Sequence, residues 1–107
     1  MQYSIIIISN KINQTFFENS IIINNCNLSI IDQNAIKYQN DILYFDYLII
    51  ENDFKNSLNL IKDNDKYITN CHHQTSIDNI FAIGDSSYSS KDINDQLKDI
   101  YEFLTNN

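Results

Sequence analysis

The chain has 107 residues, enough for one small domain, and 43% of them are hydrophobic, enough for a buried core. Its formal net charge is −7, from 14 acidic and 7 basic residues, and the basic residues form no cluster. Binding to nucleic acid or to an anionic membrane surface needs clustered Lys and Arg, so the composition argues against both.

The first part of the chain predicts two strands joined by a short connection. Residues 3–9 are an Ile-rich run, and residues 20–24 contain a second one; β-branched residues in runs this short favour strands. Between them, Ile12, Phe16 and Phe17 are spaced as on one side of a helix, so residues 10–19 predict a short helix or helical turn.

Residues 28–50 predict a three-stranded meander. Its strands are expected at 28–31, 35–38 and 41–50, with turns at Asp32-Gln-Asn and Gln39-Asn-Asp, where Asn and Asp supply the turn chemistry. The last strand alternates around Ile42 and Tyr44 and then becomes continuously apolar, which is typical of a strand buried on both faces.

The second half of the chain predicts fewer strands and one clear helix. Residues 51–65 are expected to form a loop with a helical turn, residues 67–69 a short extended piece, and residues 80–83 a strand that stops at Gly84. The final helix is expected to start from a Ser89 or Ser90 cap, with Asp92 as capping-box partner. Its apolar face consists of Ile93, Leu97, Ile100, Tyr101 and Leu104.

These elements predict an α/β fold in a single domain over residues 1–107. The expected architecture is a small β-rich sheet with a three-stranded meander and one C-terminal amphipathic helix.

The most informative stretch is residues 74–85, which read Gln-Thr-Ser-Ile-Asp-Asn-Ile-Phe-Ala-Ile-Gly-Asp. With a strand before the Gly-Asp and a helix after it, this stretch resembles the C-terminal segment of thioredoxin reductase-like flavoproteins, which are pyridine-nucleotide–disulfide oxidoreductases. The resemblance covers roughly residues 46–103. It includes Tyr67-Ile-Thr-Asn as the strand before Gln-Thr-Ser, and Phe54-Lys-Asn where that family has a Pro-Asn.

The resemblance implies a partial FAD/NAD(P)-binding fold and a cofactor site. In that family the Asp after the Gly accepts a hydrogen bond from the ribityl chain of FAD, which implies FAD contacts for Gly84 and Asp85. Gln96 matches a cofactor-binding Gln at the helix start if an insertion is allowed. A strand that stops at Gly also lets a ligand approach the backbone closely, and a helix N-terminus offers unpaired N–H donors.

Several features of a complete reductase are missing from the sequence. The single glycine cannot form a Gly-x-Gly-x-x-Gly turn, and no Cys-x-x-Cys redox pair is present. Glu51-Asn-Asp replaces the turn glycine and places carboxylates where a cofactor would need room. We therefore expect no independent enzymatic activity: the chain either completes an FAD/NAD(P)H-dependent oxidoreductase with a partner, or is a degenerate binding module without cofactors. The third alternative is an unrelated α/β domain in which the Gly-Asp string is a coincidence.

Strand 80–83 is the element from which we predict a partner, because in that family a further domain pairs with it and here its edge would be left unpaired. We expect it either to pair again within the chain or to associate with a protein partner or a second copy.

The remaining candidate residues have simpler interpretations. Cys71-His72-His73 predicts no metal site, because adjacent residues on an extended chain point to opposite faces, and we expect these residues to be exposed. Cys26 and Cys71 are expected to be free, partly buried thiols, with Cys26 packed in the core. The aromatic residues are expected to fill the core, except Tyr88, which could stack on a ligand.

Localisation is also predicted from composition. The sequence has no run of about 18 apolar residues that could span a bilayer. The apolar run Ile5–Ile8 has no basic region before it, so it does not resemble a secretory signal. The expectation is a cytoplasmic protein.

Overall fold

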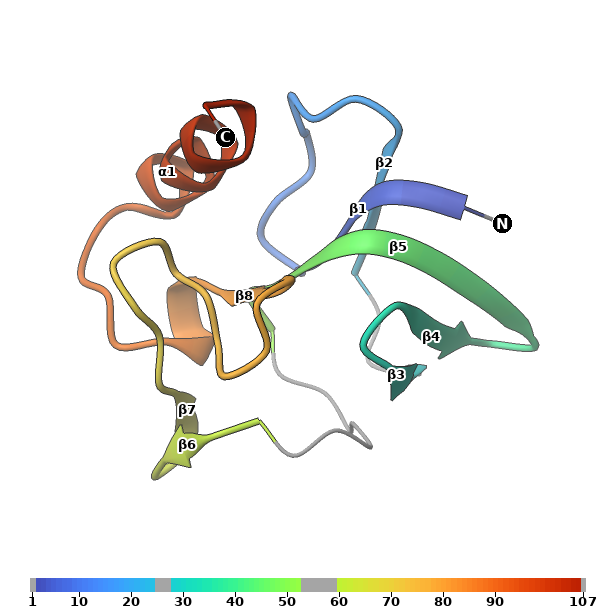
Figure 1. The fold of residues 1–107 in the computed structure, drawn as a ribbon, viewed down its shortest axis with the longest axis horizontal. Helices are drawn as coiled ribbons and strands as arrows, with labels where there is room; N and C mark the ends of the chain where they lie inside the picture. Colours follow the sequence, from blue (N-terminus) through green and yellow to red (C-terminus); the bar gives the residue numbers. More distant parts are fainter. Residues whose placement is uncertain (1, 25–27, 53–59, 107) are drawn as a thin grey trace.

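A computed structural model describes residues 2–24, 28–52 and 60–106 of the chain. It shows a small mixed α/β domain with one C-terminal helix, as the sequence predicts (Figure 1). In chain order the elements are β1 (Gln2–Ile8), β2 (Ser20–Ile23), β3 (Leu28–Asp32), β4 (Ala35–Tyr38), β5 (Asp41–Ile50), β6 (Lys62–Asp63), β7 (Lys66–Tyr67), β8 (Ile80–Ala82), the 3₁₀ turn η1 (Gly84–Ser86) and α1 (Ile93–Thr105).

The main sheet branches at β5. Strand β1 lies between β2 and β5 and runs parallel to both. On the other edge of β5, residues Asp41–Tyr44 pair with β4 in the predicted antiparallel meander, and Leu48–Ile50 pair in parallel with β8. The first half of β5 alternates between exposed and buried residues and the last three residues are all buried, because that end lies between β1 and β8.

Two apolar layers cover the two faces of this sheet. On one face, Ile7, Ile49 and Phe81 pack against Leu97 and Ile100 of α1. On the other, alternate residues of the same strands pack against the β3–β4 hairpin and Tyr67. Figure 1 shows α1 and the β1–β2 connection on one side of the sheet and the β6–β7 hairpin on the opposite side.

Strand β8 pairs within the chain on both of its edges. One edge pairs with β5, and on the other the N–H of Thr75 donates to the carbonyl of Ile80 at 2.8 Å. The N–H of Ala82 donates to the carbonyl of His73 at 3.0 Å. Re-pairing within the chain is therefore the outcome observed for this strand.

The connection between β1 and β2 is not helical, contrary to prediction. The backbone N–H groups of Lys11 and Ile12 bond to the side chain of Ser9, and Asn19 turns the chain at φ 49° before β2. Ile12 and Phe17 are buried but Phe16 is 53% exposed, so the predicted helical face does not exist. The side chains of Ser9 and Thr15 accept hydrogen bonds from backbone N–H groups two or three residues further along the chain, and such local bonds replace the helical ones.

Two further boundaries differ from the predictions. Helix α1 begins at Ile93 with Asp92 as its cap, whose carboxylate accepts from the Asn94 N–H at 3.1 Å; Ser89 and Ser90 precede it. Residues 62–67, expected as the end of a loop and an extended piece, form the β6–β7 hairpin, which turns through Asn64 at φ 58°. The loop with a helical turn is predicted over residues 51–65, and its residues 53–59, with the Phe54-Lys-Asn match, lie outside the described residues, as does the core thiol predicted at Cys26.

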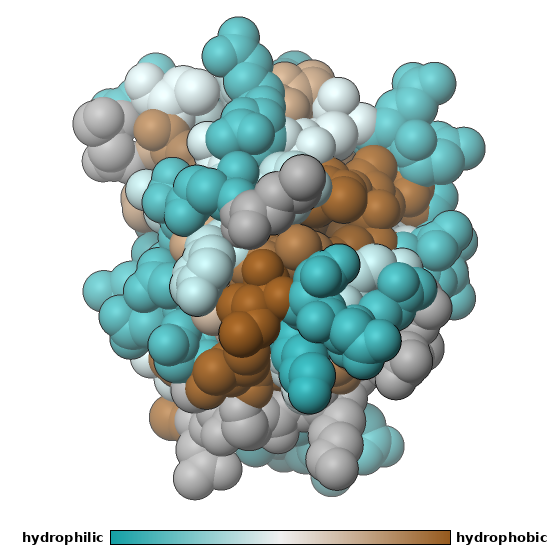
Figure 2. Space-filling model, turned by 90° about the vertical axis from the view of Figure 1, so that its right-hand side faces the viewer, coloured by the Kyte–Doolittle hydropathy of each residue, from teal (hydrophilic) through white to brown (hydrophobic). Residues whose placement is uncertain are grey.

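Apolar side chains also reach the surface on the side of β3, β4 and β5, where Figure 2 shows a brown band. Exposed large hydrophobic residues of these strands are Ile31, Ile42 and Tyr44, so the aromatic residues do not all fill the core. In the described part of the chain, no helix has both the length and the apolar character needed to cross a membrane.

Candidate functional site at the carboxyl ends of the parallel strands

The topology brings the ends of four parallel strands to one edge of the sheet. Their order is β2-β1-β5-β8, and the chain leaves β1 towards β2 but leaves β5 towards β8 on the opposite side. The position between the carboxyl ends of β1 and β5 is therefore a topological switch point. Open α/β sheets bind ligands in a crevice at such a point, and we call this position the crevice. Ser9 follows β1, Glu51 follows β5, and Ile83 and then Gly84 follow β8.

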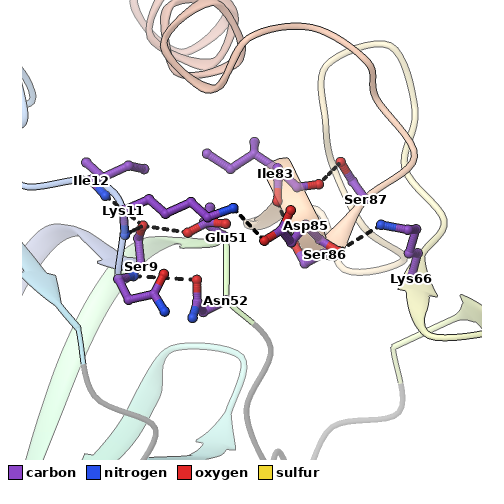
Figure 3. A network of polar contacts seen from close by, with 12 residues as sticks. Ser9, Lys11, Ile12, Glu51, Asn52, Lys66, Ile83, Asp85, Ser86 and Ser87 are labelled. Carbon is purple, nitrogen blue, oxygen red and sulfur yellow. Dashed lines mark hydrogen bonds and ion pairs between the residues drawn. The ribbon is translucent and has the colours of Figure 1, made fainter.

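Ser9 organises the exit from β1 and is fully buried. Its Oγ accepts hydrogen bonds from the backbone N–H groups of Lys11 at 3.0 Å and Ile12 at 2.9 Å. The same hydroxyl donates to Oε1 of Glu51 at 2.7 Å, across the switch point (Figure 3). One serine thus shapes the turn after β1 and joins it to the end of β5.

Glu51 fills the crevice with a buried carboxylate. Its residue exposure is 0%, and its backbone N–H donates to the carbonyl of Ile8 at 2.9 Å, which holds it at the switch point. Oε1 is bonded to Ser9, but the buried Oε2 has no hydrogen-bond partner among the described residues. A buried carboxylate oxygen without a partner is costly, so this position is not explained by stability alone.

Because Gly84 has no Cβ, the side chain of Glu51 can pack directly against it. A Cβ at this position would lie 2.9 Å from Cγ and 3.1 Å from Oε2 of Glu51, and 3.3 Å from Cδ1 of Ile93. Gly84 also has φ 56°, a conformation in which a Cβ is strained. The close approach that the glycine permits is therefore used by the chain's own carboxylate.

Asp85 lies at the surface and forms an ion pair with Lys11. Their oxygen and nitrogen atoms are 2.6 Å apart, and the side chains are 71% and 50% exposed (Figure 3). The hydrogen bond from Lys11 lowers the pKa of the Asp85 carboxyl, and the same bond raises the pKa of the Lys11 ammonium. Lys66 donates to the backbone carbonyl of Asp85 at 3.0 Å, so two lysines lie around this turn.

Gln96, the third predicted cofactor-binding residue, is fully buried beneath the turn. Its Oε1 accepts from the Gly84 N–H at 3.2 Å, and its Nε2 donates to the carbonyl of Lys91 at 2.7 Å. The structure therefore brings Gly84, Asp85 and Gln96 together. Of the three, only Asp85 presents a largely exposed side chain to a ligand.

An open depression of about 500 Å³ lies beside this turn, between η1 and the start of α1. Tyr88, the predicted stacking residue, is 54% exposed there, and its hydroxyl donates to the carbonyl of Asp63 at 2.6 Å. The helix start is occupied by the Asp92 carboxylate, which takes the place that an anionic ligand would use.

The Cys71-His72-His73 stretch lies away from this crevice. No group of three or more potential metal-ligating side chains occurs among the described residues. The predicted exposure is confirmed for Cys71 and His72 and is wrong for His73, which is 6% exposed and lies 3.0 Å from Asp99. The separate prediction of a partly buried Cys71 thiol is therefore wrong. The ring of His72 stacks on Phe103 at 4.2 Å. His73 turns the chain at φ 68°, so the extended geometry assumed for this stretch does not apply.

Sequence reasoning missed Ser9 and Lys11 as members of this site. The available indication was positional: both follow the first buried strand, and residues after such strands meet at one edge of a parallel sheet.

Comparison of the chain with family models, with curated proteins and with solved structures gives no match.

Proposed function

We propose that this chain is a non-catalytic binding module, in which the crevice that a flavin or nicotinamide cofactor would use is closed by the chain's own side chains. The observation that carries the proposal is the position of Glu51. Its carboxylate lies at the switch point, bonded to Ser9 and packed against the one glycine that would let a cofactor reach the backbone. A cofactor phosphate or ring edge would have to displace this buried side chain.

No assembled catalytic group occurs in residues 2–24, 28–52 and 60–106, and this supports the same proposal. The exposed Cys71 has no hydrogen-bonded base among the described residues, and His73 is paired with Asp99. The hydroxyl of Ser9 donates a hydrogen bond to the buried side chain of Glu51 and is itself buried, so it is not presented to a substrate.

A second candidate function is a thioredoxin reductase-like fragment that completes an FAD site in a complex. It is favoured by the place of Asp85, which follows the carboxyl end of a parallel strand with a largely exposed carboxylate. In this alternative the Gly-rich phosphate turn and the redox cysteines come from a partner chain, and Asp85 accepts a hydrogen bond from a sugar hydroxyl of the flavin.

A visible absorbance spectrum after incubation with FAD and dialysis distinguishes the two candidates. The binding-module proposal predicts a folded protein, by circular dichroism, that retains no flavin band. A retained band that is lost in Asp85→Asn but kept in Asp41→Asn, a matched exposed carboxylate on the far hairpin, would instead support the flavin candidate.

A further inference from the structure

An aromatic cleft of about 400 Å³ lies between the β1–β2 connection and the C-terminal half of α1. Figure 1 shows these two segments on the same side of the sheet. The walls are Phe16, Phe17, Tyr47, Tyr101 and Leu104. The residues of β1 and β5 that line this cleft come earlier in their strands than the carboxyl ends, which Ser9 and Glu51 follow. The cleft is therefore separate from the Ser9–Glu51 crevice.

The rings of the cleft pack against one another, and two of them remain exposed. Phe16 lies 5.0 Å from Phe17 and 5.2 Å from Tyr101, measured between ring centroids. Phe17 is buried, whereas Phe16 is 53% and Tyr101 is 39% exposed. Aromatic rings fixed by neighbours are preorganised contact surface, because little side-chain freedom remains to be lost when a partner binds.

Two carboxylates flank this apolar surface. Glu18 follows the two phenylalanines and Asp46 precedes Tyr47, and both line the cleft. Neither side-chain carboxylate has a hydrogen bond or ion pair with another described residue, and the described lining contains no Lys or Arg. The chain as a whole carries a formal charge of −7.

We propose that the aromatic cleft binds a peptide segment of a partner protein in which an aliphatic or aromatic anchor is flanked by Lys or Arg. The anchor would cover Phe16 and Tyr101, and the flanking cations would pair with Glu18 and Asp46. A second copy of this chain fits less well, because it brings the same excess of negative charge to carboxylates that need cations.

This inference rests on the proposed function only in that the chain acts by binding. The flavin spectrum reports on the crevice and a peptide titration reports on the cleft, so each proposal can fail while the other stands.

The test is a titration of the ¹⁵N-labelled full chain with a short synthetic peptide in which Lys alternates with Leu and Phe. Two controls replace every Lys by Glu, or every Leu and Phe by Ser. We expect amide shift changes confined to residues around 16–18, 46–47 and 101–105 with the cationic peptide, and weaker binding as salt screens the carboxylates. Neither control peptide should produce them.

Variants of the cleft sharpen the result. Phe16→Ser and the double variant Glu18→Lys, Asp46→Lys should each weaken binding of the cationic peptide on the order of tenfold. Tyr44→Ser, at a similarly exposed aromatic residue on another surface, should leave it unchanged. The amide spectrum of each variant reports its folding, and if Phe16→Ser does not fold, the charge variant alone decides.

Three outcomes overturn the proposal. One is equal binding of the Lys and Glu peptides. Another is no shift change in the cleft at about 1 mM peptide, which corresponds to affinity too weak to be specific. The third is self-association of the free chain that Phe16→Ser abolishes, which would make a second copy the occupant.

Discussion

Replacing Gly84 by alanine is expected to lower the free energy of unfolding by about 1–5 kcal/mol. The backbone at φ 56° costs an L-residue about 1–2 kcal/mol. The new Cβ would also lie 2.9 Å from Cγ of Glu51, well inside the contact distance of about 3.5–4.0 Å between carbon atoms. Overpacking of this kind costs about 1–3 kcal/mol, and the reduced freedom of the unfolded chain returns about 0.4–1 kcal/mol.

Glu51 has little room to relieve the contact, because its Oε1 is bonded to Ser9 and its side chain is fully buried. Truncating that side chain should therefore remove the steric part of the penalty. In a double-mutant cycle, the cost of Gly84→Ala should fall by about 1–3 kcal/mol when Glu51→Ala is already present. The backbone part should remain.

Urea denaturation of the four proteins measures these terms, followed by circular dichroism or by fluorescence of the seven tyrosines, since the chain has no Trp. Asn64→Ala is the matched control, because Asn64 has φ 58° in an exposed hairpin turn. The reasoning is refuted if Gly84→Ala costs no more than Asn64→Ala, or if the Gly84 and Glu51 substitutions are additive.

Three other predictions concern the same edge of the sheet. Ser9→Ala should cost about 3 kcal/mol in urea denaturation, because it removes the donor to the buried Glu51 carboxylate and the acceptor for two backbone N–H groups. Asp92→Ala should cost about 1 kcal/mol by loss of the α1 cap, with no change in the contacts of β1. In an NMR titration the pKa of Asp85 should lie below its ordinary value and rise in Lys11→Met. Because the folded pKa is the lower one, the pair's contribution to stability is present above the unfolded pKa and is lost as the pH falls through the folded one.

The sheet could be predicted from the sequence because its strands carry strong local patterns. Runs such as Ile5–Ile8 and the apolar end of β5 have the β-branched composition of buried parallel strands, and the meander has Asn and Asp at its turns. Helix α1 could be predicted from the spacing of its apolar residues, although the predicted cap, Ser89 or Ser90, lies before the observed cap, Asp92. The spacing of Ile12, Phe16 and Phe17 predicts a helix that does not form, because the same spacing also suits an irregular connection that buries two of the three residues.

The site was less predictable because its contacts join residues distant in sequence. Ser9 and Glu51 are 42 residues apart, and their hydrogen bond depends on the pairing of β1 with β5. Gly84 and Asp85 were identified from a local string, but no local feature indicated that Glu51 would pack on the glycine. Burial of His73 likewise depends on α1, which supplies Asp99.

The use of glycine in this chain argues that the Gly84–Glu51 contact is specific. At four described positions with positive φ the chain has a residue other than glycine: Asn19, Gln39, Asn64 and His73. Backbone conformation alone therefore does not require the one glycine of the chain to be at position 84. What distinguishes that position is the absence of space for a Cβ, because Glu51 fills it. A buried carboxylate with a partnerless oxygen and the glycine that admits it thus form one unit, and that unit occupies the switch point where a sheet of this topology would otherwise receive a ligand.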